Sequence, residues 1–173
     1  MFDRYAGDNQ TKLLWTQKVY LIPGTNQLCI PALNIVSFLS SHNTNSAPKR
    51  LRDKRKYKDI ANACLSFVTI SGPPECPDFL PLLRGSERIV MGDPGANEVD
   101  PISGVYMKRD VARLDKGIPN PKERAVLPPP WAVEFTLSLT ANKEIQEQEI
   151  RNLFEEGGIA IGLGPQAPCK PFT

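Results

Sequence analysis

The residues with the clearest chemical potential form one cationic segment, "KRLRDKRKYK", at positions 49–58. Seven of its ten residues are Lys or Arg and one is Asp53, so the segment carries +6, whereas the whole 173-residue chain carries +2. Clustered cations neutralise phosphates and release the counterions condensed on a nucleic acid. The concentration of positive charge therefore favours a polyanionic ligand. A solvated charged face, or a patch that meets an acidic protein, would give the same pattern.

The residues expected to contact nucleic acid are of three kinds. Cations would meet phosphates, one aromatic ring would stack on a base at about 1–3 kcal/mol, and glycine amides would approach a phosphate where no Cβ intervenes. The set is Lys49, Arg50, Arg52, Lys54, Arg55, Lys56, Tyr57, Lys58, Arg109, Arg113, Gly158, Gly162 and Gly164. A helix C-cap followed by a tight bend explains the glycines equally well, and no P-loop is present because GK[ST] is missing.

Residues that serve metal binding or catalysis elsewhere show no useful spacing here. The four cysteines (Cys29, Cys64, Cys76 and Cys169) lie far apart without a CxxC pair, and His42 is the only histidine. We therefore expect no zinc site and no Ser/His/Asp or Cys/His arrangement, and we expect Cys29 and Cys64 to pack as reduced thiols. No spacing singles out a pair among Asp93, Asp100, Asp110 and Asp115, and "DPGANEVDP" lacks the EF-hand ligand pattern. The expectation is a non-enzyme without a metal or cofactor.

The totals describe an ordinary globular chain with many prolines. Apolar residues make up 40% and charged residues 23%, and 173 residues suffice for a single domain with its own core. No apolar run approaches eighteen residues and no leader pattern is visible, so we expect a soluble, cytoplasmic protein. The 17 prolines, many of them in the middle third, predict ordered loops and turns there.

The first part of the chain predicts strand, helix and strand. "KLLWTQKVYLIP" has apolar residues at alternate positions apart from Gln17, which predicts a strand, and "LCIP" follows the turn "GTNQ" as another. "PALNIVSFLSS" predicts a largely buried helix with Pro31 at its first position, because its polar residues share one narrow strip. "NACLSFVTI" predicts a buried strand that ends at Ser71-Gly72-Pro73.

The remainder predicts a loop region followed by a second strand, helix and strand. From Pro73 to Pro130 the signals are mostly those of loops, including "GPPECPDFLP" and "DKGIPNP", with two short strand candidates, "ERIVM" and "GVYMKRDV". "WAVEFTLSL" alternates apolar and polar residues, as half-buried strands do. "NKEIQEQEIRNLFEEGG" predicts a helix capped by Asn142 and closed by Gly157 or Gly158, with Ile150, Leu153 and Phe154 facing inward. "IAIGLG" predicts a final strand.

This order of elements is typical of an α+β, ferredoxin-like (RRM-like) fold, with an antiparallel sheet and helices packed on one face. We expect one domain over residues 1–173. Its core would comprise about 11–72 and 124–164, and a proline-rich loop or thumb region of about 73–123 would be inserted between the halves.

Three stretches resemble the RAMP superfamily, the ferredoxin-like RNA-binding proteins of CRISPR systems. "LFEEGGIAIGLG" is similar to its C-terminal glycine-rich element, and "LCIPALNIVSFL" to the entry of its first helix. The order of "ERAVLPPPWAVEFTLSL", helix and glycine turn resembles small phage-type relatives of the CRISPR backbone subunit, in which an inserted thumb projects from the core. The resemblance covers residues 13–70 and 124–164.

The resemblance implies a non-catalytic subunit of a ribonucleoprotein complex in antiviral defence. Such a subunit holds RNA, for example a CRISPR guide RNA, or single-stranded DNA, and assembles with copies of itself or with other effector-complex subunits, without a membrane partner. Two alternatives stay open. One is a phage-type structural or counter-defence protein whose basic segment binds a protein. The other is a metal-independent RNA endonuclease that uses His42, because enzymes of this superfamily place a histidine near the end of the first helix.

Overall fold

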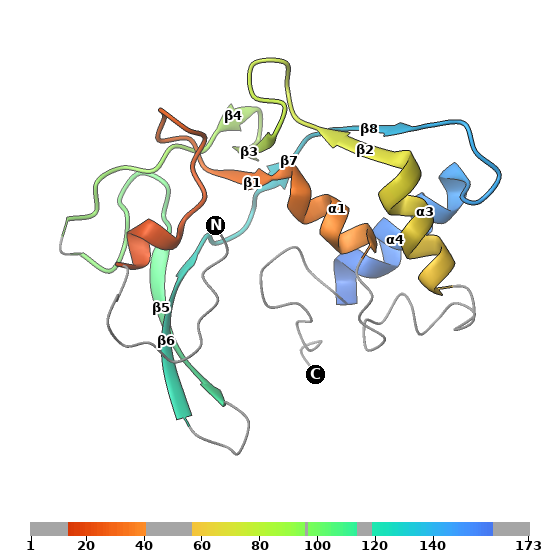
Figure 1. Cartoon of the computed structure of the whole chain (residues 1–173). Coiled ribbons are helices and arrows are strands. Elements are labelled where there is room, and N and C mark those ends of the chain that lie inside the picture. Colours follow the sequence, from red (N-terminus) through yellow and green to blue (C-terminus); the bar gives the residue numbers. More distant parts are fainter. Residues whose placement is uncertain (1–13, 41–56, 96, 114–118, 161–173) are drawn as a thin grey trace. The chain divides into compact units, whose positions relative to one another are not determined.

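Figure 1 shows a computed structural model of the chain, which describes residues 14–40, 57–95, 97–113 and 119–160. The fold is α+β with antiparallel strand pairs. The chain divides into two compact units. Unit 1 comprises Met1–Leu28 and Leu82–Ala132, and unit 2 comprises Cys29–Pro81 and Val133–Thr173.

Unit 2 contains three helices and short antiparallel strand pairs in its described residues. Its elements are β1 (Cys29–Pro31), α1 (Ala32–Ser40), α3 (Tyr57–Phe67), β2 (Val68–Ser71), β8 (Thr136–Leu139) and α4 (Glu147–Ala160), together with the first half of β3 (Phe79–Arg84). Strand β1 pairs with that half of β3. Strand β2 pairs with β8, so that Val68 lies opposite Leu139 and Ile70 opposite Leu137.

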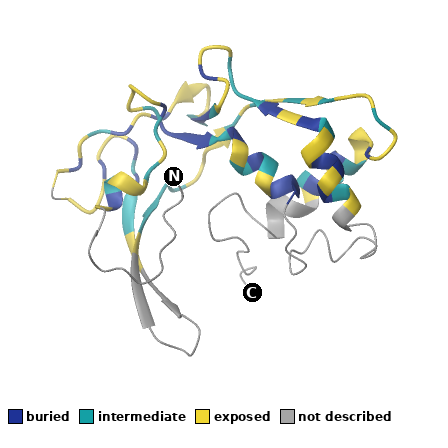
Figure 2. Cartoon of the chain, in the orientation of Figure 1, coloured by how far each residue is buried: buried dark blue, intermediate teal, exposed yellow. Residues whose placement is uncertain are grey.

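A single apolar core joins the helices of unit 2 to the β2–β8 pair. Figure 2 shows buried positions along the inner faces of α1, α3 and β2. The buried members of the core are Ala32, Ile35, Phe38, Leu39, Ala63, Cys64, Val68, Ile70, Leu80, Ile145, Ile150 and Leu153. Two ring contacts extend it across α4, because Phe154 stacks on Phe38 at a centroid distance of 5.6 Å and lies 5.8 Å from Phe135.

The turn that follows β2 is tight and depends on Gly72. The Gly72 N–H donates to the Pro77 carbonyl at 2.7 Å. A Cβ at this position would lie 2.2 Å from the Phe79 carbonyl oxygen and 2.8 Å from that of Cys76. Both obstacles are backbone atoms and cannot move aside cheaply, so only glycine fits where the chain turns from β2 toward β3.

Unit 1 is built around a long β-hairpin. Its elements are η1 (Trp15–Lys18, a 3₁₀ helix), the second half of β3, β4 (Glu87–Arg88), β5 (Tyr106–Arg113) and β6 (Pro119–Val126), and β7 (Ala132–Val133) spans the sequence boundary between the units. Strands β5 and β6 pair over eight residues, from Tyr106 opposite Val126 to Arg113 opposite Pro119. The short strand β4 pairs with the end of β3.

Several elements predicted from the sequence are confirmed. Strand β1 lies within "LCIP" and α1 within "PALNIVSFLSS", although Pro31 belongs to β1 and the helix begins at Ala32. Strand β5 begins within "GVYMKRDV" and continues two residues beyond it, to Arg113. Strands β7 and β8 fall in "WAVEFTLSL", where Val133, Phe135, Leu137 and Leu139 pack on the core as the alternation predicts. Trp131, at the start of the same pattern, is 41% exposed.

Several predictions of secondary structure are wrong. The strand predicted around Trp15 is a 3₁₀ helix, because the Gln17 side chain accepts the Leu14 N–H and closes a turn. Residues 62–67, predicted as strand, continue helix α3, since a short apolar run has no periodicity that separates strand from helix. Residues 79–81 and 119–121, predicted as loop, belong to β3 and β6. Helix α4 begins only at Glu147, so Asn142 does not cap it and instead accepts the N–H groups of Glu144 and Ile145 in the preceding turn. The helix passes through Gly157 and Gly158 to Ala160, so neither glycine closes it and residues 159–160 of the predicted final strand are helical.

The predicted thiol packing is confirmed. Cys29, Cys64 and Cys76 carry reduced thiols and are buried. Burial, with a smaller contribution from Cys76, raises the pKa of the Cys29 thiol to about 11, so this thiol is protonated at neutral pH and packs as a small apolar group. Cys169 lies outside the described residues.

Candidate nucleic-acid interface

The cationic segment leads directly into helix α3. Lys49, Arg50, Arg52, Lys54, Arg55 and Lys56 lie outside the described residues, and so does His42. The last two residues of the segment, Tyr57 and Lys58, form the beginning of α3, which is anchored on the core through Ala63 and Cys64. The segment is therefore tied at its C-terminal end to a helix of fixed position within unit 2.

The charges of unit 2 are sharply divided along the sequence. Over Cys29–Pro81 and Val133–Thr173, residues 49–58 supply seven cations and one acidic residue, while the rest supplies three cations and nine acidic residues. The segment thus carries +6 and the rest of the unit −6. A polyanion that approaches unit 2 would be attracted by this segment and repelled elsewhere, which limits where nucleic acid can bind.

The sign of the charge changes at the first turn of α3. An open groove of about 470 Å³ is lined by Asp59, Ile60, Asn62, Glu144 and Glu149. Carboxylates in the first turn of a helix interact favourably with the helix dipole, which accounts for Asp59 in α3 and for Glu147 and Glu149 in α4. These acidic residues have a structural role, and they mark a surface that phosphates would avoid.

The glycines singled out near the C-terminus do not form the predicted turn at residues 157–158. Gly158 has helical backbone within α4, where an N–H points toward the carbonyl four residues earlier instead of toward a ligand. Gly162 and Gly164 lie outside the described residues. A phosphate contact therefore stays a prediction only for Gly162 and Gly164.

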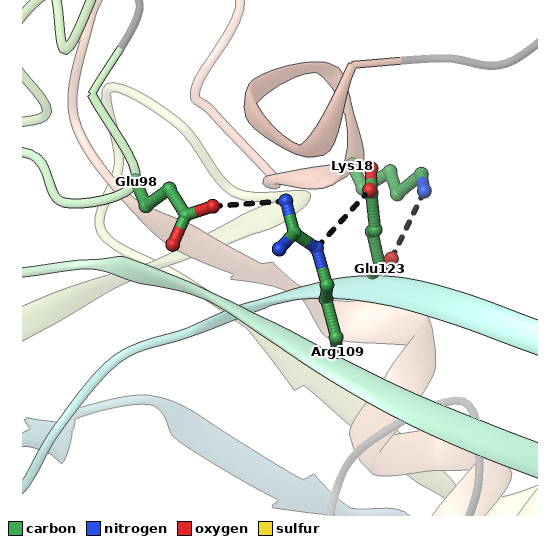
Figure 3. A network of polar contacts seen from close by, with 4 residues as sticks. All are labelled: Lys18, Glu98, Arg109 and Glu123. Atoms are coloured by element: carbon green, nitrogen blue, oxygen red, sulfur yellow. Dashed lines mark hydrogen bonds and ion pairs between the residues drawn. The ribbon is translucent and has the colours of Figure 1, made fainter.

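The two cations predicted outside the segment lie on β5 of unit 1. Figure 3 shows that Arg109 is held between two carboxylates: its Nη2 lies 2.9 Å from Glu98 Oε1 and its Nε lies 3.7 Å from Glu123 Oε1. Lys18 of η1 donates from Nζ to the Glu123 carbonyl at 2.9 Å, which ties η1 to the hairpin. A phosphate at Arg109 would have to compete with both carboxylates. Arg113 lies opposite Pro119 in the hairpin register.

The acidic residues considered for metal binding have separate structural positions. Asp93 is exposed and accepts the Gly95 N–H at 2.9 Å, and Asp110 lies opposite Lys122 in the hairpin. Asp115 lies outside the described residues. In the part of the chain that the structure describes, no three His, Cys, Asp or Glu side chains are grouped so that they could hold a metal ion.

Asp100 is the most unusual of these carboxylates, because its side chain is completely buried. It accepts the Gly92 N–H at 3.1 Å and the Ser103 N–H at 2.9 Å, and it also accepts the Ser103 hydroxyl. Burial acts to raise its pKa, but the hydrogen bonds from Ser103, Gly92 and Ile102 together prevail and lower it below 3.8. The ionised carboxylate therefore organises the loop that leads into β5.

The partners of Arg109 and the role of Asp100 were not predicted from the sequence. The pair Asp100 and Ser103 in "DPISG" has the spacing at which Asp and Ser side chains bond to nearby backbone, and this local signal could have predicted the turn. The ion pairs of Arg109 depend on a hairpin register and on a loop eleven residues away, for which the sequence has no local signal.

Comparison with known proteins does not place the chain in a group. No protein family, no curated protein and no solved structure shows a significant match to this sequence or fold. Among the described helices, none is both long and apolar enough to span a membrane.

Proposed function

We propose that this protein is a non-catalytic subunit that binds single-stranded nucleic acid, either RNA or DNA, along the cationic segment 49–58. The observation that carries the proposal is the division of charge in unit 2, where ten residues carry +6 and the rest of the unit carries −6. A surface that contacts only solvent has no need to separate positive from negative charge. A surface that binds a polyanion does need this separation, because each phosphate that it neutralises releases counterions. Tyr57, at the junction with α3, would stack on a base.

The proposal includes a relationship to the RAMP superfamily and its ferredoxin-like fold. It is supported by the arrangement within unit 2, where β1 leads into α1, α3 leads into β2, and β8 is followed by α4. The strands β2 and β8 are antiparallel neighbours, and residues of all three helices contribute to one core with them. In this proposal the protein works in the cytoplasm and assembles with copies of itself, or with other subunits, along a guide strand.

Binding of a fluorescent single-stranded RNA, titrated at several salt concentrations, tests the proposal directly. Removing two cations of the segment with Arg52→Ala and Lys56→Ala should weaken binding to all sequences alike, because backbone contacts carry no sequence information. The slope of log affinity against log salt should fall by about 1.4, since each lost contact to a single strand contributes about 0.7.

A matched control removes two cations elsewhere in the same unit. Lys143 and Arg151 are both exposed, and the double variant Lys143→Ala and Arg151→Ala changes the net charge by the same amount. It should leave the affinity and the salt slope close to those of the parent protein. If the parent protein has no measurable affinity for RNA or DNA at low salt, the proposal fails. The alternative, in which the segment docks on an acidic protein, would then be favoured.

A further inference from the structure

Strand β8 has an edge whose backbone groups have no strand partner among the described residues. The Thr140 N–H donates to the Phe67 carbonyl at 2.9 Å, and these two residues continue the β2–β8 register. In an antiparallel pair, residues that bond across the ladder alternate with residues that do not. Thr136 and Ser138 therefore bond toward β2, while the N–H and C=O groups of Leu137 and Leu139 point away from it. In the part of the chain described, no other strand pairs with β8.

This edge lacks the features that keep sheet edges from pairing. Protected edges carry charged side chains, prolines or bulges. Strand β6 has two prolines and Lys122, and β4 consists of Glu87 and Arg88. Strand β8 reads "TLSL", without charge or proline, and its register with β2 is continuous. Of these strands, β8 is the one best suited to accept a partner strand.

The burial of side chains distinguishes the β8 edge from the β2 edge. Val68 and Ile70 on β2 are each only 7% exposed, whereas Leu137 and Leu139 on β8 are only partly buried. A two-stranded pair is marginally stable in water, and a third strand beside β8 would cover the remaining apolar surface of these leucines. A strand added beside β2 would bury little more.

We propose that a second copy of this chain pairs with this edge, so that β8 lies antiparallel to β8 of the other copy about a two-fold axis near Ser138. The two edges are identical, and antiparallel pairing matches the outward donors and acceptors of Leu137 and Leu139 with the same groups of the partner. The apolar sides of the two strand pairs then form one continuous face. The remaining strand of unit 2, β1, is already paired with β3.

The charges at the two ends of β8 favour the antiparallel arrangement. Glu134 precedes β8 and Lys143 follows it, and both are exposed. Antiparallel pairing brings the Glu134 end of one copy next to the Lys143 end of the other, at both ends of the interface. Parallel pairing would instead place like charges together, which is unfavourable. This dimer does not depend on nucleic acid, so it can be tested apart from the proposed function.

The test compares two lysine variants by sedimentation velocity of the full chain, after nuclease treatment and at low salt, where charge repulsion is not screened. Ser138→Lys places like charges beside the two-fold axis and should raise the dimer dissociation constant by about tenfold or more. Thr69 lies directly opposite Ser138 on β2, is exposed on the same face, and is one strand spacing, about 4.8 Å, farther from the edge. Thr69→Lys should leave the parent dimer intact.

Amide hydrogen exchange identifies the paired edge residue by residue. In the parent protein the amides of Leu137 and Leu139 should become protected as protein concentration rises, and Ser138→Lys should remove this protection. A parent protein that is monomeric at high concentration overturns the proposal. Protection at Leu137 and Leu139 that does not change with concentration also overturns it, because another segment of the same chain would then occupy the edge. Dissociation by Thr69→Lys, with Ser138→Lys still dimeric, would place the interface at β2 instead.

Discussion

The core of unit 2 and the loop before β5 in unit 1 are stabilised in different ways. In unit 2, helices and strands meet through a continuous set of apolar side chains, to which the stacked rings of Phe38 and Phe154 contribute. In unit 1, the loop before β5 is organised by one buried carboxylate, Asp100, which accepts hydrogen bonds from Gly92 and Ser103. Apolar packing is non-directional, whereas the contacts of a buried carboxylate are directional and few.

The difference determines which substitutions each region tolerates. A core built from many apolar contacts accepts changes of similar volume, because neighbouring side chains can rearrange. The partners of a buried ionised group cannot rearrange in this way. Each hydrogen-bond donor that loses the carboxylate as its acceptor stays buried and keeps its full desolvation cost. The four predictions below test this contrast, from the largest expected effect to the smallest.

Phe38→Ala should have the largest effect, a loss of about 3–5 kcal/mol in the free energy of unfolding, because it removes a buried ring and leaves a cavity beside Phe154. Urea unfolding followed by circular dichroism measures it. Leu33→Ala on the same helix is the control, since Leu33 is 58% exposed and its truncation should cost less than about 0.5 kcal/mol. Equal effects of the two variants would show that α1 does not pack as described.

Asp100→Asn should cost about 2–3 kcal/mol, although it changes the side-chain volume very little. The amide nitrogen that replaces one carboxylate oxygen cannot accept the hydrogen bonds made to that oxygen, and the charge that strengthens the remaining bonds from Gly92 and Ser103 is lost. Asp93→Asn, at an exposed turn, should be nearly neutral. If Asp100→Asn were also neutral, hydrogen bonding to a buried carboxylate would not be what holds this loop.

The same carboxylate predicts a pH dependence with a definite sign. Because the folded pKa of Asp100 lies below its usual value of 3.8, the ionised group stabilises the fold fully above about pH 5. This contribution is lost as the pH falls through the depressed folded pKa. The difference in unfolding free energy between the parent protein and Asp100→Asn should therefore shrink between pH 5 and the most acidic pH at which the protein folds. A constant difference would contradict the assignment.

Arg109→Ala should have the smallest effect, less than about 1 kcal/mol, because the ion pairs of Arg109 with Glu98 and Glu123 are exposed to solvent. The effect should diminish further at high salt, which screens exposed charges. Unfolding of the parent and the variant at low and high salt measures it. A loss comparable to that of Asp100→Asn would mean that the exposed network contributes as much to unit 1 as the buried one.

The elements that sequence analysis predicted well are those with clear periodicity or punctuation. Helix α1 has a narrow polar strip, and the residues around β8 alternate strictly, so local patterns sufficed. The errors arose where tertiary contacts decided the outcome. Residues 62–67 form helix because Ala63 and Cys64 are enclosed by the core, and β6 forms despite Pro119 and Pro121 because it pairs with β5.

The candidate site was predictable in composition and not in its contacts. The charge of residues 49–58 is evident in the sequence, and so is the acidic character of the rest of unit 2. The surroundings of Arg109 were not predictable, because Glu98 and Glu123 are brought to it by a loop and by the hairpin register. The edge of β8 that has no strand partner in the described residues could not be predicted either, since it depends on which strands of the folded chain pair with each other.

The turn at Gly72 has a consequence for the ancestry of this protein. Two backbone carbonyls occupy the space that any side chain would need, so natural selection should have removed every substitution at this position for as long as the fold has existed. Descendants of a common ancestor can exchange core residues of similar volume until their overall sequence identity is low, while Gly72 stays unchanged. A search for relatives of this chain should therefore give most weight to a glycine that directly follows a strand rich in β-branched residues and precedes a proline-rich turn.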